Sequence, residues 1–260
     1  MVSRKLVTLG ICSALFLGLT ACQQQHATSE GTNQRQTSSA KVPWKASYTN
    51  LNNQVSTEEV KSLLSANLDP NSVNAFFNLV NDYNTIVGST GLSGDFTSFT
   101  HTEYDVEKIS HLWNQKKGDF VGTNCRINSY CLLKNSVTIP KLEKNDQLLF
   151  LDNDAIDKGK VFDAKDKEEF DILFSRVPTE ATTDVKVHAE KMEKFFSQFQ
   201  FNDKARMLSV VLHDNLDGEF LFVGHVGVLV PADDGFLFVE KLTFEEPYQA
   251  IKFASKEDCY

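Results

Sequence analysis

The chain has 260 residues, 41% of them hydrophobic, and a formal net charge of −9 at pH 7. Nucleic acid and anionic lipid surfaces both attract basic patches, so this acidic balance argues against either as a binding partner. The hydrophobic share, which includes 20 Phe, is enough for one sizeable core, and one domain is the default for this length.

The N-terminal residues have the order of an export signal. A basic pair, Arg4 and Lys5, precedes the apolar stretch Leu6 to Leu19, and Leu19-Thr20-Ala21-Cys22 matches the lipobox that is cleaved before a lipid-modified cysteine. The apolar stretch is shorter than the ~20 residues of a membrane span, the alternative interpretation. Residues 1–21 are therefore predicted to be a lipoprotein signal peptide, and the lipid on Cys22 a membrane anchor.

The predicted lipid anchor determines where the protein is located and how the mature chain is divided into a tether and a domain. Cleavage before Cys22 removes two basic residues and no acidic ones, which takes the net charge from −9 to −11. The protein is predicted at the extracellular face of the cytoplasmic membrane, held there by lipid. Residues 22–41 are rich in Gln, Ser and Thr and predict a flexible tether, followed by a single α+β domain over residues 42–260.

Apolar spacing and capping residues predict helices in the first two thirds of the domain. Between them, residues 137–161 read as irregular, with a possible strand at 148–151. Asp152-Asn153-Asp154 resembles the start of a calcium loop but lacks its later ligand and glycine, so we favour an acidic, solvated turn. The predicted helices cover residues 56–68, 70–87, 104–117, 166–175 and 184–199, with one more within 122–134.

From Met207 onward the sequence has the pattern of β-strands. Runs of β-branched and aromatic residues cover 207–213, 219–230 and 236–242, separated by turns rich in Asp and Gly, and residues 249–253 are a possible fourth strand. A helical N-terminal part followed by an antiparallel C-terminal sheet is an α+β fold.

The cysteines point to a reactive thiol. Beyond Cys22, the mature chain retains Cys125, Cys131 and Cys259, an odd number. Cys125 and Cys131 are six residues apart on different faces of a predicted helix, too distant for a disulfide. Cys125 would lie in the first turn, where free N–H groups, the helix dipole and the neighbouring Arg126 favour a thiolate. Cys131, on the apolar face, should only pack.

His225 is the predicted partner of this thiol. It lies between Gly224 and Gly227, and we read these glycines as room for a substrate or another backbone beside the ring. If Ala232 and Gly235 close a two-residue turn, Glu240 lies on the same face as His225 at a diagonal distance of ~7–8 Å, within reach of its imidazole. A longer turn would move Glu240 to the other face.

Two resemblances follow from these residues. His225 to Pro231, a strand leading into a hairpin, resembles the histidine strand of papain-fold peptidases and amidases of the NlpC type, and Cys125 at a helix start is similar to their nucleophile. This resemblance implies a papain-like arrangement and thiol hydrolase activity. The chain also resembles an uncharacterised family of Gram-positive lipoproteins, which implies an envelope location but no known activity. This resemblance rests on the lipobox, Asn124-Cys125-Arg126, Gly224-His225-Val226-Gly227-Val228 and Glu246-Pro247-Tyr248-Gln249.

The chemistry assigns a role to each predicted site residue. The Cys125 thiolate would attack an amide or ester carbonyl, His225 would protonate the leaving group, and Glu240 would orient His225. The N–H of Cys125 would stabilise the oxyanion, with Asn124 or Gln115 assisting. The location suggests peptide crosslinks of the cell wall as substrate.

Other readings remain open. The protein could be a ligand- or partner-binding lipoprotein on the same scaffold, without catalysis. It could equally be an adhesion or assembly module in which Cys125 only packs. No cofactor is predicted, and no metal, because His101 and His111 are not at zinc spacing.

Overall fold

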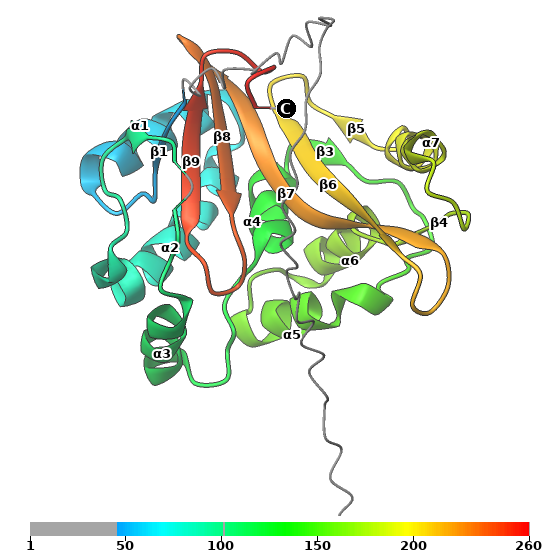
Figure 1. Cartoon of the computed structure of the whole chain (residues 1–260), viewed down its shortest axis with the longest axis horizontal. Helices are drawn as coiled ribbons and strands as arrows, with labels where there is room; N and C mark the ends of the chain where they lie inside the picture. Colours follow the sequence, from blue (N-terminus) through cyan, green and yellow to red (C-terminus); the bar gives the residue numbers. More distant parts are fainter. Residues whose placement is uncertain (1–45, 101, 260) are drawn as a thin grey trace, which may run out of the picture. The chain divides into compact units, whose positions relative to one another are not determined.

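Residues 46–100 and 102–259 are described in a computed structural model. Their helices and antiparallel strands form the α+β fold that the sequence predicts (Figure 1). The predicted signal peptide, Cys22 and the tether lie outside the described residues.

The helices begin where the sequence offers a capping side chain. Asn53, Asp69, Asp105, Asn124 and Asp163 each accept a hydrogen bond from the first turn of the helix that follows. All six predicted helices are present, with somewhat different ends. Within the described residues the helices are α1 (Gln54–Asn67), α2 (Pro70–Val87), α3 (Val106–Lys117), α4 (Cys125–Leu133), α5 (Phe150–Gly159), α6 (Ala164–Leu173) and α7 (Val185–Phe196), with 3-10 turns η1 (Gly88–Thr90) and η2 (Gln147–Leu149).

Helix α5 corrects the prediction for residues 148–151. The short apolar run belongs to η2 and the start of α5, not to a strand. Leu149, Ala155 and Ile156 are buried at helical spacing. Asp152 is fully buried in the first turn of α5, so the prediction of a solvated acidic turn is also wrong at this position. A buried carboxylate needs a partner, which the candidate site supplies.

The sheet is antiparallel in every described pairing, and its main path runs β2-β1-β9-β8-β7-β4, with β6 also paired to β7. All four predicted C-terminal strands are present. The prediction missed β1, which lies between β2 and β9. The strands of this sheet are β1 (Ala46–Thr49), β2 (Thr97–Ser98), β4 (Val177–Pro178), β6 (Arg206–Asp214), β7 (Phe220–Ala232), β8 (Gly235–Lys241) and β9 (Tyr248–Phe253); β3 (Val137–Thr138) and β5 (Gln200–Phe201) form a separate pair.

The turn between β7 and β8 has the predicted length. Ala232 pairs with Gly235, which leaves two residues in the turn, and the ladder continues to Val228 opposite Val239. Gly235 has a φ of +142°, a conformation that L side chains rarely adopt. This turn fixes the register of the two strands and therefore the face on which Glu240 lies.

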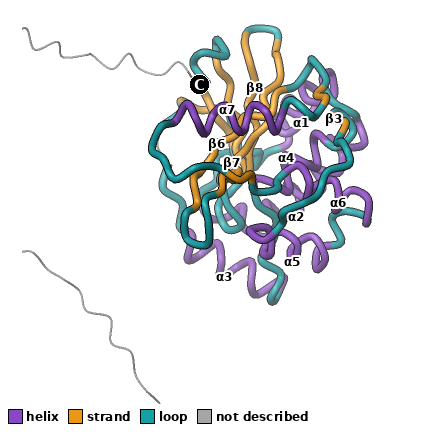
Figure 2. The backbone as a smooth tube through the Cα atoms, turned by 90° about the vertical axis from the view of Figure 1, so that its right-hand side faces the viewer, coloured by secondary structure: helices purple, strands orange, loops and turns teal. Residues whose placement is uncertain are grey.

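One face of the sheet carries the main core. Viewed from the side, α1, α2, α4 and α6 lie on the same side of the strands (Figure 2). Helix α4 is the central element, because every residue from 127 to 133 is buried. A helix that is apolar or buried all round belongs in the interior, with other elements on every side.

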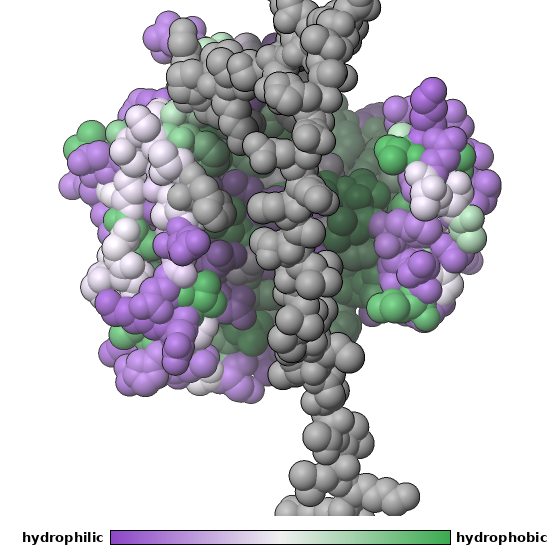
Figure 3. Space-filling model, in the orientation of Figure 1, coloured by the Kyte–Doolittle hydropathy of each residue, from purple (hydrophilic) through white to green (hydrophobic). Residues whose placement is uncertain are grey.

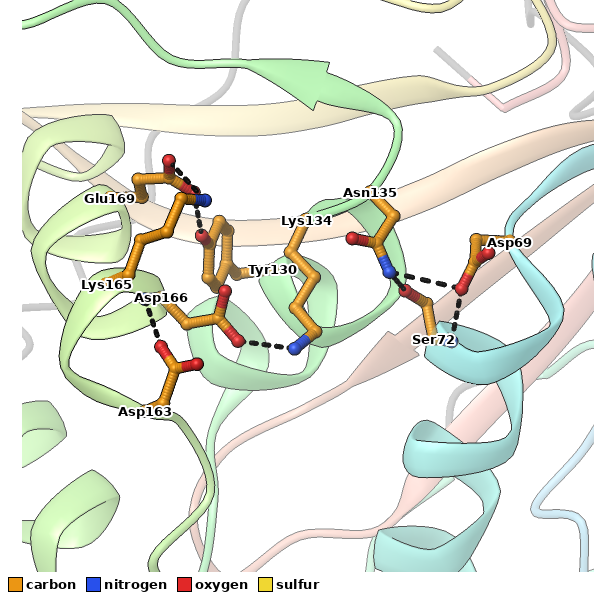
Figure 4. A network of polar contacts seen from close by, with 9 residues as sticks. All are labelled: Asp69, Ser72, Tyr130, Lys134, Asn135, Asp163, Lys165, Asp166 and Glu169. Atoms are coloured by element: carbon orange, nitrogen blue, oxygen red, sulfur yellow. Dashed lines mark hydrogen bonds and ion pairs between the residues drawn. The ribbon is translucent and has the colours of Figure 1, made fainter.

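The C-terminal end of α4 is tied to its neighbours by polar contacts (Figure 4). Lys134 forms an ion pair with Asp166 of α6, and the Tyr130 hydroxyl donates to Glu169 Oε2 at 3.1 Å. On the other side, Asn135 donates to Asp69 at the start of α2. These contacts hold α4 between α6 and α2 and so fix the direction in which its N-terminus points.

Strand β7 parts from β8 in front of α4. Its C-terminal half pairs with β8, whereas Phe220 and Leu221 at its start pair with β4. Between these two pairings the strands diverge, and α4 lies behind the opening (Figure 1). On the other edge, Val210 of β6 pairs with His225 and Val211 with Val223, which leaves Gly224 as a β-bulge. A bulge re-aims the side chains beside it, and His225 is the next residue.

Candidate thiol site

Cys125 is the first residue of α4, and its side chain is nearly buried, at 5% exposure. The Asn124 side chain caps the helix by accepting from Ile127 N–H at 3.1 Å, and Asn128 N–H bonds to the Asn124 carbonyl. The N–H groups of Cys125 and Arg126 precede these bonds and have no intrahelical acceptor. The thiol is therefore next to two N–H donors at the positive end of a helix dipole.

His225 lies between this thiol and Glu240. Its Nε2 is 2.5 Å from Glu240 Oε2, and its side chain is 32% exposed while that of Glu240 is 10% exposed. The contact with Cys125, followed by that with Glu240, raises the pKa of His225 to about 10 against the opposing effect of burial. An imidazole with that pKa is protonated at neutral pH and favours a thiolate beside it. The predicted contact between His225 and Glu240 is thus present.

The two glycines beside His225 have a packing reason that the sequence did not reveal. A Cβ on Gly227 would come within 2.2 Å of the Phe238 ring, and a Cβ on Gly224 within 2.5 Å of Leu212. The space over each glycine is filled by a side chain of this protein. Of the two alternatives, the close approach of another backbone is present at Gly227, where the Val239 carbonyl lies 2.9 Å from the position of a Cβ, whereas the room for a substrate is filled by Phe238 and Leu212.

Arg126 has a fixed partner instead of a free charge. Its guanidinium holds the Asp152 carboxylate with two bonds, Nε to Oδ1 at 2.9 Å and Nη2 to Oδ2 at 2.7 Å. A third bond runs from Nη1 to the carbonyl of Val223, directly before the bulge, at 2.9 Å. Arg126 therefore joins α4, α5 and β7, the elements around the thiol and the imidazole.

Asp152 is the residue that the prediction missed in this arrangement. It also accepts from the Asn124 amide at 2.7 Å, so one buried carboxylate fixes both neighbours of Cys125. No local signal marks Asp152, because an acidic run with Asn looks like a surface turn. Only the packing of α5 against α4 reveals its partners.

The predicted side-chain oxyanion donors are engaged elsewhere. The Asn124 amide nitrogen is used by Asp152, and its oxygen caps the helix. Gln115 is an exposed residue of α3, where its amide pairs with His111 on the same helix at 2.9 Å. The backbone N–H of Cys125, which was predicted, and that of Arg126, which was not, remain as donors.

The chain matches the family described as "Domain of unknown function (DUF4300)" over residues 47–260. The chain belongs to the DUF4300 family. Cys125, His225 and Glu240 all fall within the matched residues of this family. No curated protein and no solved structure matches the chain.

None of the three thiols in the described residues forms a disulfide. Cys125 and Cys131 are thus not bridged to each other, as predicted. Burial raises the pKa of Cys131 to about 12. Burial, with a smaller effect of the Glu240 charge, raises the pKa of Cys259 to about 11. Both should stay protonated and unreactive at neutral pH.

His188 and His213 have structural partners. His188 of α7 and His213 of β6 have ring centroids 4.6 Å apart, and His213 pairs with Glu219 at 2.6 Å. Among the described residues, no cluster of three or more His, Cys, Asp or Glu side chains is arranged to hold a metal. Within the same residues, no helix is both long and apolar enough to span a bilayer.

A groove of about 810 Å³ lies between α7 and β6, away from the thiol. Its lining includes Met192, Phe196 and Met207 but neither Cys125 nor His225. In the space-filling view, hydrophobic residues are visible in the recessed area on this side (Figure 3). This groove is therefore separate from the candidate chemistry.

Proposed function

We propose that this protein is a lipid-anchored thiol hydrolase of the cell envelope, an amidase or peptidase that cleaves cell-wall peptides. The observation that carries the proposal is the row of side chains Cys125, His225 and Glu240, with the thiol at a helix start and a 2.5 Å bond between His225 and Glu240. A nucleophile, a base and an orienting carboxylate in contact are the parts of a catalytic triad.

The reaction follows from these parts. The Cys125 thiolate attacks the substrate carbonyl and forms an S–C bond, while the carbonyl oxygen takes the electron pair and accepts from the N–H groups of Cys125 and Arg126. The C–N bond then breaks, and the proton of His225 moves to the leaving amine. His225 next takes a proton from water, which attacks the thioester and releases a carboxylic acid and the thiolate.

Two sets of contacts hold the site residues in place: the bond from Glu240 to His225, and the bonds from the buried Asp152 to Arg126 and Asn124, which we call the buried bracket. Glu240 fixes the orientation of the imidazole and favours its charged form. Asp152 holds Arg126 and Asn124, which flank the nucleophile. A triad needs its members within hydrogen-bond reach, so rigid support of both strands and helix matters for the rate.

The likeness to papain-fold enzymes remains part of the proposal. A cysteine at the N-terminus of a central helix, packed behind the strand that carries the histidine, is consistent with it. The envelope location rests on the lipobox before Cys22, which lies outside the described residues. Wall peptides are the amides nearest to an enzyme anchored there.

The test of the site measures alkylation of Cys125 by iodoacetamide as a function of pH. Trypsin cuts after Arg126, so Cys125 falls in the peptide 118–126 and Cys131 in 127–134, and mass spectrometry reads each thiol separately. We expect Cys125 to be alkylated faster near neutral pH than a free thiol, and His225→Ala to remove that advantage. Cys131 is the internal control. A normal Cys125 titration in both proteins would overturn the proposal.

The test of activity uses peptidoglycan fragments with intact stem peptides. We expect the full-length chain to release new amino and carboxyl groups, and Cys125→Ala to release none. A thioester adduct on the peptide 118–126 would identify the nucleophile directly. Equal release by the Cys125→Ala variant would assign the cleavage to a contaminant.

A non-catalytic, ligand- or partner-binding lipoprotein on the same scaffold is the second candidate. The observation that favours it is the 5% exposure of Cys125, which leaves little thiol surface for a substrate. A binder needs no thiolate at neutral pH. The alkylation profile therefore separates the two candidates.

A further inference from the structure

Lys241 is a buried cation that the proposed mechanism does not use. It is the last residue of β8, follows Glu240 directly and is only 1% exposed. Its Nζ lies 4.1 Å from the ring centroid of Tyr83 and 5.3 Å from that of Tyr248. Lysine is among the residues least often fully buried, so this position calls for a physical reason.

The ammonium is bonded to backbone rather than to carboxylates. It donates to the carbonyl oxygens of Thr243 at 2.9 Å and Phe244 at 3.2 Å, and also to that of Glu246. The Tyr83 hydroxyl donates to the carbonyl of Glu245. The turn between β8 and β9 is therefore fixed from inside by one lysine and one tyrosine.

This turn packs against the segment that leads into the nucleophile helix. The Phe244 carbonyl lies 3.6 Å from the position of a Cβ on Gly122, three residues before Cys125. Phe244 also packs against the core cluster that contains Cys125. Lys241 thus contacts the β8–β9 turn that packs against the residues before Cys125, whereas His225 approaches the thiol from β7.

The charged groups that act on Lys241 are two carboxylates of the β8–β9 turn and the thiol at the start of α4. Burial lowers the pKa of Lys241 to about 7, and Glu245, Glu246 and the Cys125 thiolate act against that shift. Tyr83 and Tyr248 face it as neutral rings, because burial raises the pKa of both hydroxyls. The Tyr248 hydroxyl donates to Asn128 of α4 at 3.1 Å, and the Tyr248 ring lies 5.3 Å from Lys241 Nζ, so the buried ammonium lies beside the first turns of the nucleophile helix.

We propose that Lys241 is a positioning residue of the thiol site, whose buried positive charge stabilises the Cys125 thiolate from beneath and whose three carbonyl bonds hold the β8–β9 turn against the nucleophile segment. This inference rests on the proposed thiolate chemistry and adds to it. Two cations then act on the thiolate: His225, which stays charged to high pH, and Lys241, which is charged only on the acidic side.

The pH profile of Cys125 alkylation distinguishes charge from structure. In the full-length chain, Lys241→Met should slow alkylation of the peptide 118–126 at pH 6 by about threefold to tenfold, the effect of half to one unit of thiol pKa. At pH 9, where Lys241 of the wild type is largely uncharged, the two rates should differ less than at pH 6, and the difference that remains measures the loss of the three carbonyl bonds. A purely structural role would give the same ratio of rates at both pH values. Lys252→Met, on β9 and paired with Glu59, is the matched control.

Glu246→Gln keeps the test decisive if Lys241→Met fails to fold. Removing this carboxylate lowers the pKa of Lys241 further, so Cys125 should be alkylated more slowly near pH 7 in Glu246→Gln than in the wild type. Equal rates in the wild type and Lys241→Met at pH 6 would overturn the inference about Lys241 alone, provided that the profile still depends on His225. Where Lys241→Met does not fold, equal rates in the wild type and Glu246→Gln near pH 7 would overturn it in the same way. A pH profile of Cys125 alkylation that matches a free thiol and is the same in His225→Ala would instead overturn the proposed function.

Discussion

Glu240 reaches His225 across the point where their two strands separate: Glu240 Oε2 lies 2.5 Å from His225 Nε2, whereas the backbone ladder ends at Val228 and Val239. Beyond the ladder no backbone bond holds β7 and β8 together at this point. The side-chain bond therefore connects the strands where α4 presents its thiol. The negative charge of Glu240 is then as important for the thiol site as the position of its carboxylate.

Replacing Glu240 by Gln tests that charge. Gln can keep a hydrogen bond to the imidazole but cannot raise its pKa, so His225 should lose part of its positive charge near neutral pH. We expect alkylation of Cys125 to fall by up to roughly tenfold at pH values below the midpoint of its alkylation profile, where a shift of that midpoint by one pH unit changes the thiolate fraction about tenfold. Glu219→Gln, which removes the carboxylate from the exposed His213 pair, is the control and should leave the rate unchanged. An unchanged rate in Glu240→Gln would show that the pair is only structural.

His225 and Lys241 should affect the pH dependence of stability in opposite directions. The pKa of His225 is raised from 6.5 to about 10, so its stabilisation is complete below pH 6.5 and is lost as the pH rises towards 10. The pKa of Lys241 is lowered from 10.5 to about 7, so its burial costs free energy at low pH and that cost disappears as the pH rises from 7.

Urea unfolding at several pH values between 7 and 9 measures both effects. Relative to the wild type, the free energy of unfolding of His225→Gln should increase with pH, and that of Lys241→Met should decrease. Comparison with the wild type cancels the titration of the other thiols and tyrosines. Parallel curves for both variants would contradict the two pKa shifts.

Asp152→Asn should destabilise the fold and disturb the thiol together. It leaves the Arg126 guanidinium largely buried without its carboxylate, a loss of about 3–5 kcal/mol for a broken buried pair. Because Arg126 and Asn124 flank Cys125, alkylation of the folded variant should also slow. Asp154→Asn, two residues on, removes only a solvent-exposed pair with Lys158 and should cost less than about 1 kcal/mol. Equal stability of the two variants would refute the bracket.

The two glycines of β7 should respond differently to alanine. In Gly227→Ala the new Cβ meets the Phe238 ring and, at 2.9 Å, the Val239 carbonyl, which cannot move freely. We expect a loss of about 1–3 kcal/mol in thermal or urea unfolding. In Gly224→Ala the new Cβ meets only the Leu212 side chain, which is 47% exposed and can rotate away. A larger cost at Gly224 than at Gly227 would mean that the bulge itself needs glycine.

Much of the site could be predicted because its signals are local. Asn124 is a strong cap, so the helix start at Cys125 follows from neighbouring residues. The two residues between Ala232 and Gly235 fix the hairpin register, and the period of two along a strand then puts Glu240 on the face of His225. These relations depend on a few consecutive residues and on backbone geometry alone.

The remaining parts depend on contacts between distant segments. Asp152 and Lys241 look like surface residues in sequence, since charged side chains are mostly exposed, yet both are buried. Gln115 looked available for the site but lies on an exposed helix face.

The sequence by itself determined the α+β class, the helix start at Cys125 and the register of the β7–β8 hairpin. Only the tertiary structure decided which charges are buried beside the thiol, because the partners of a buried charge come from elements that the chain brings together on folding.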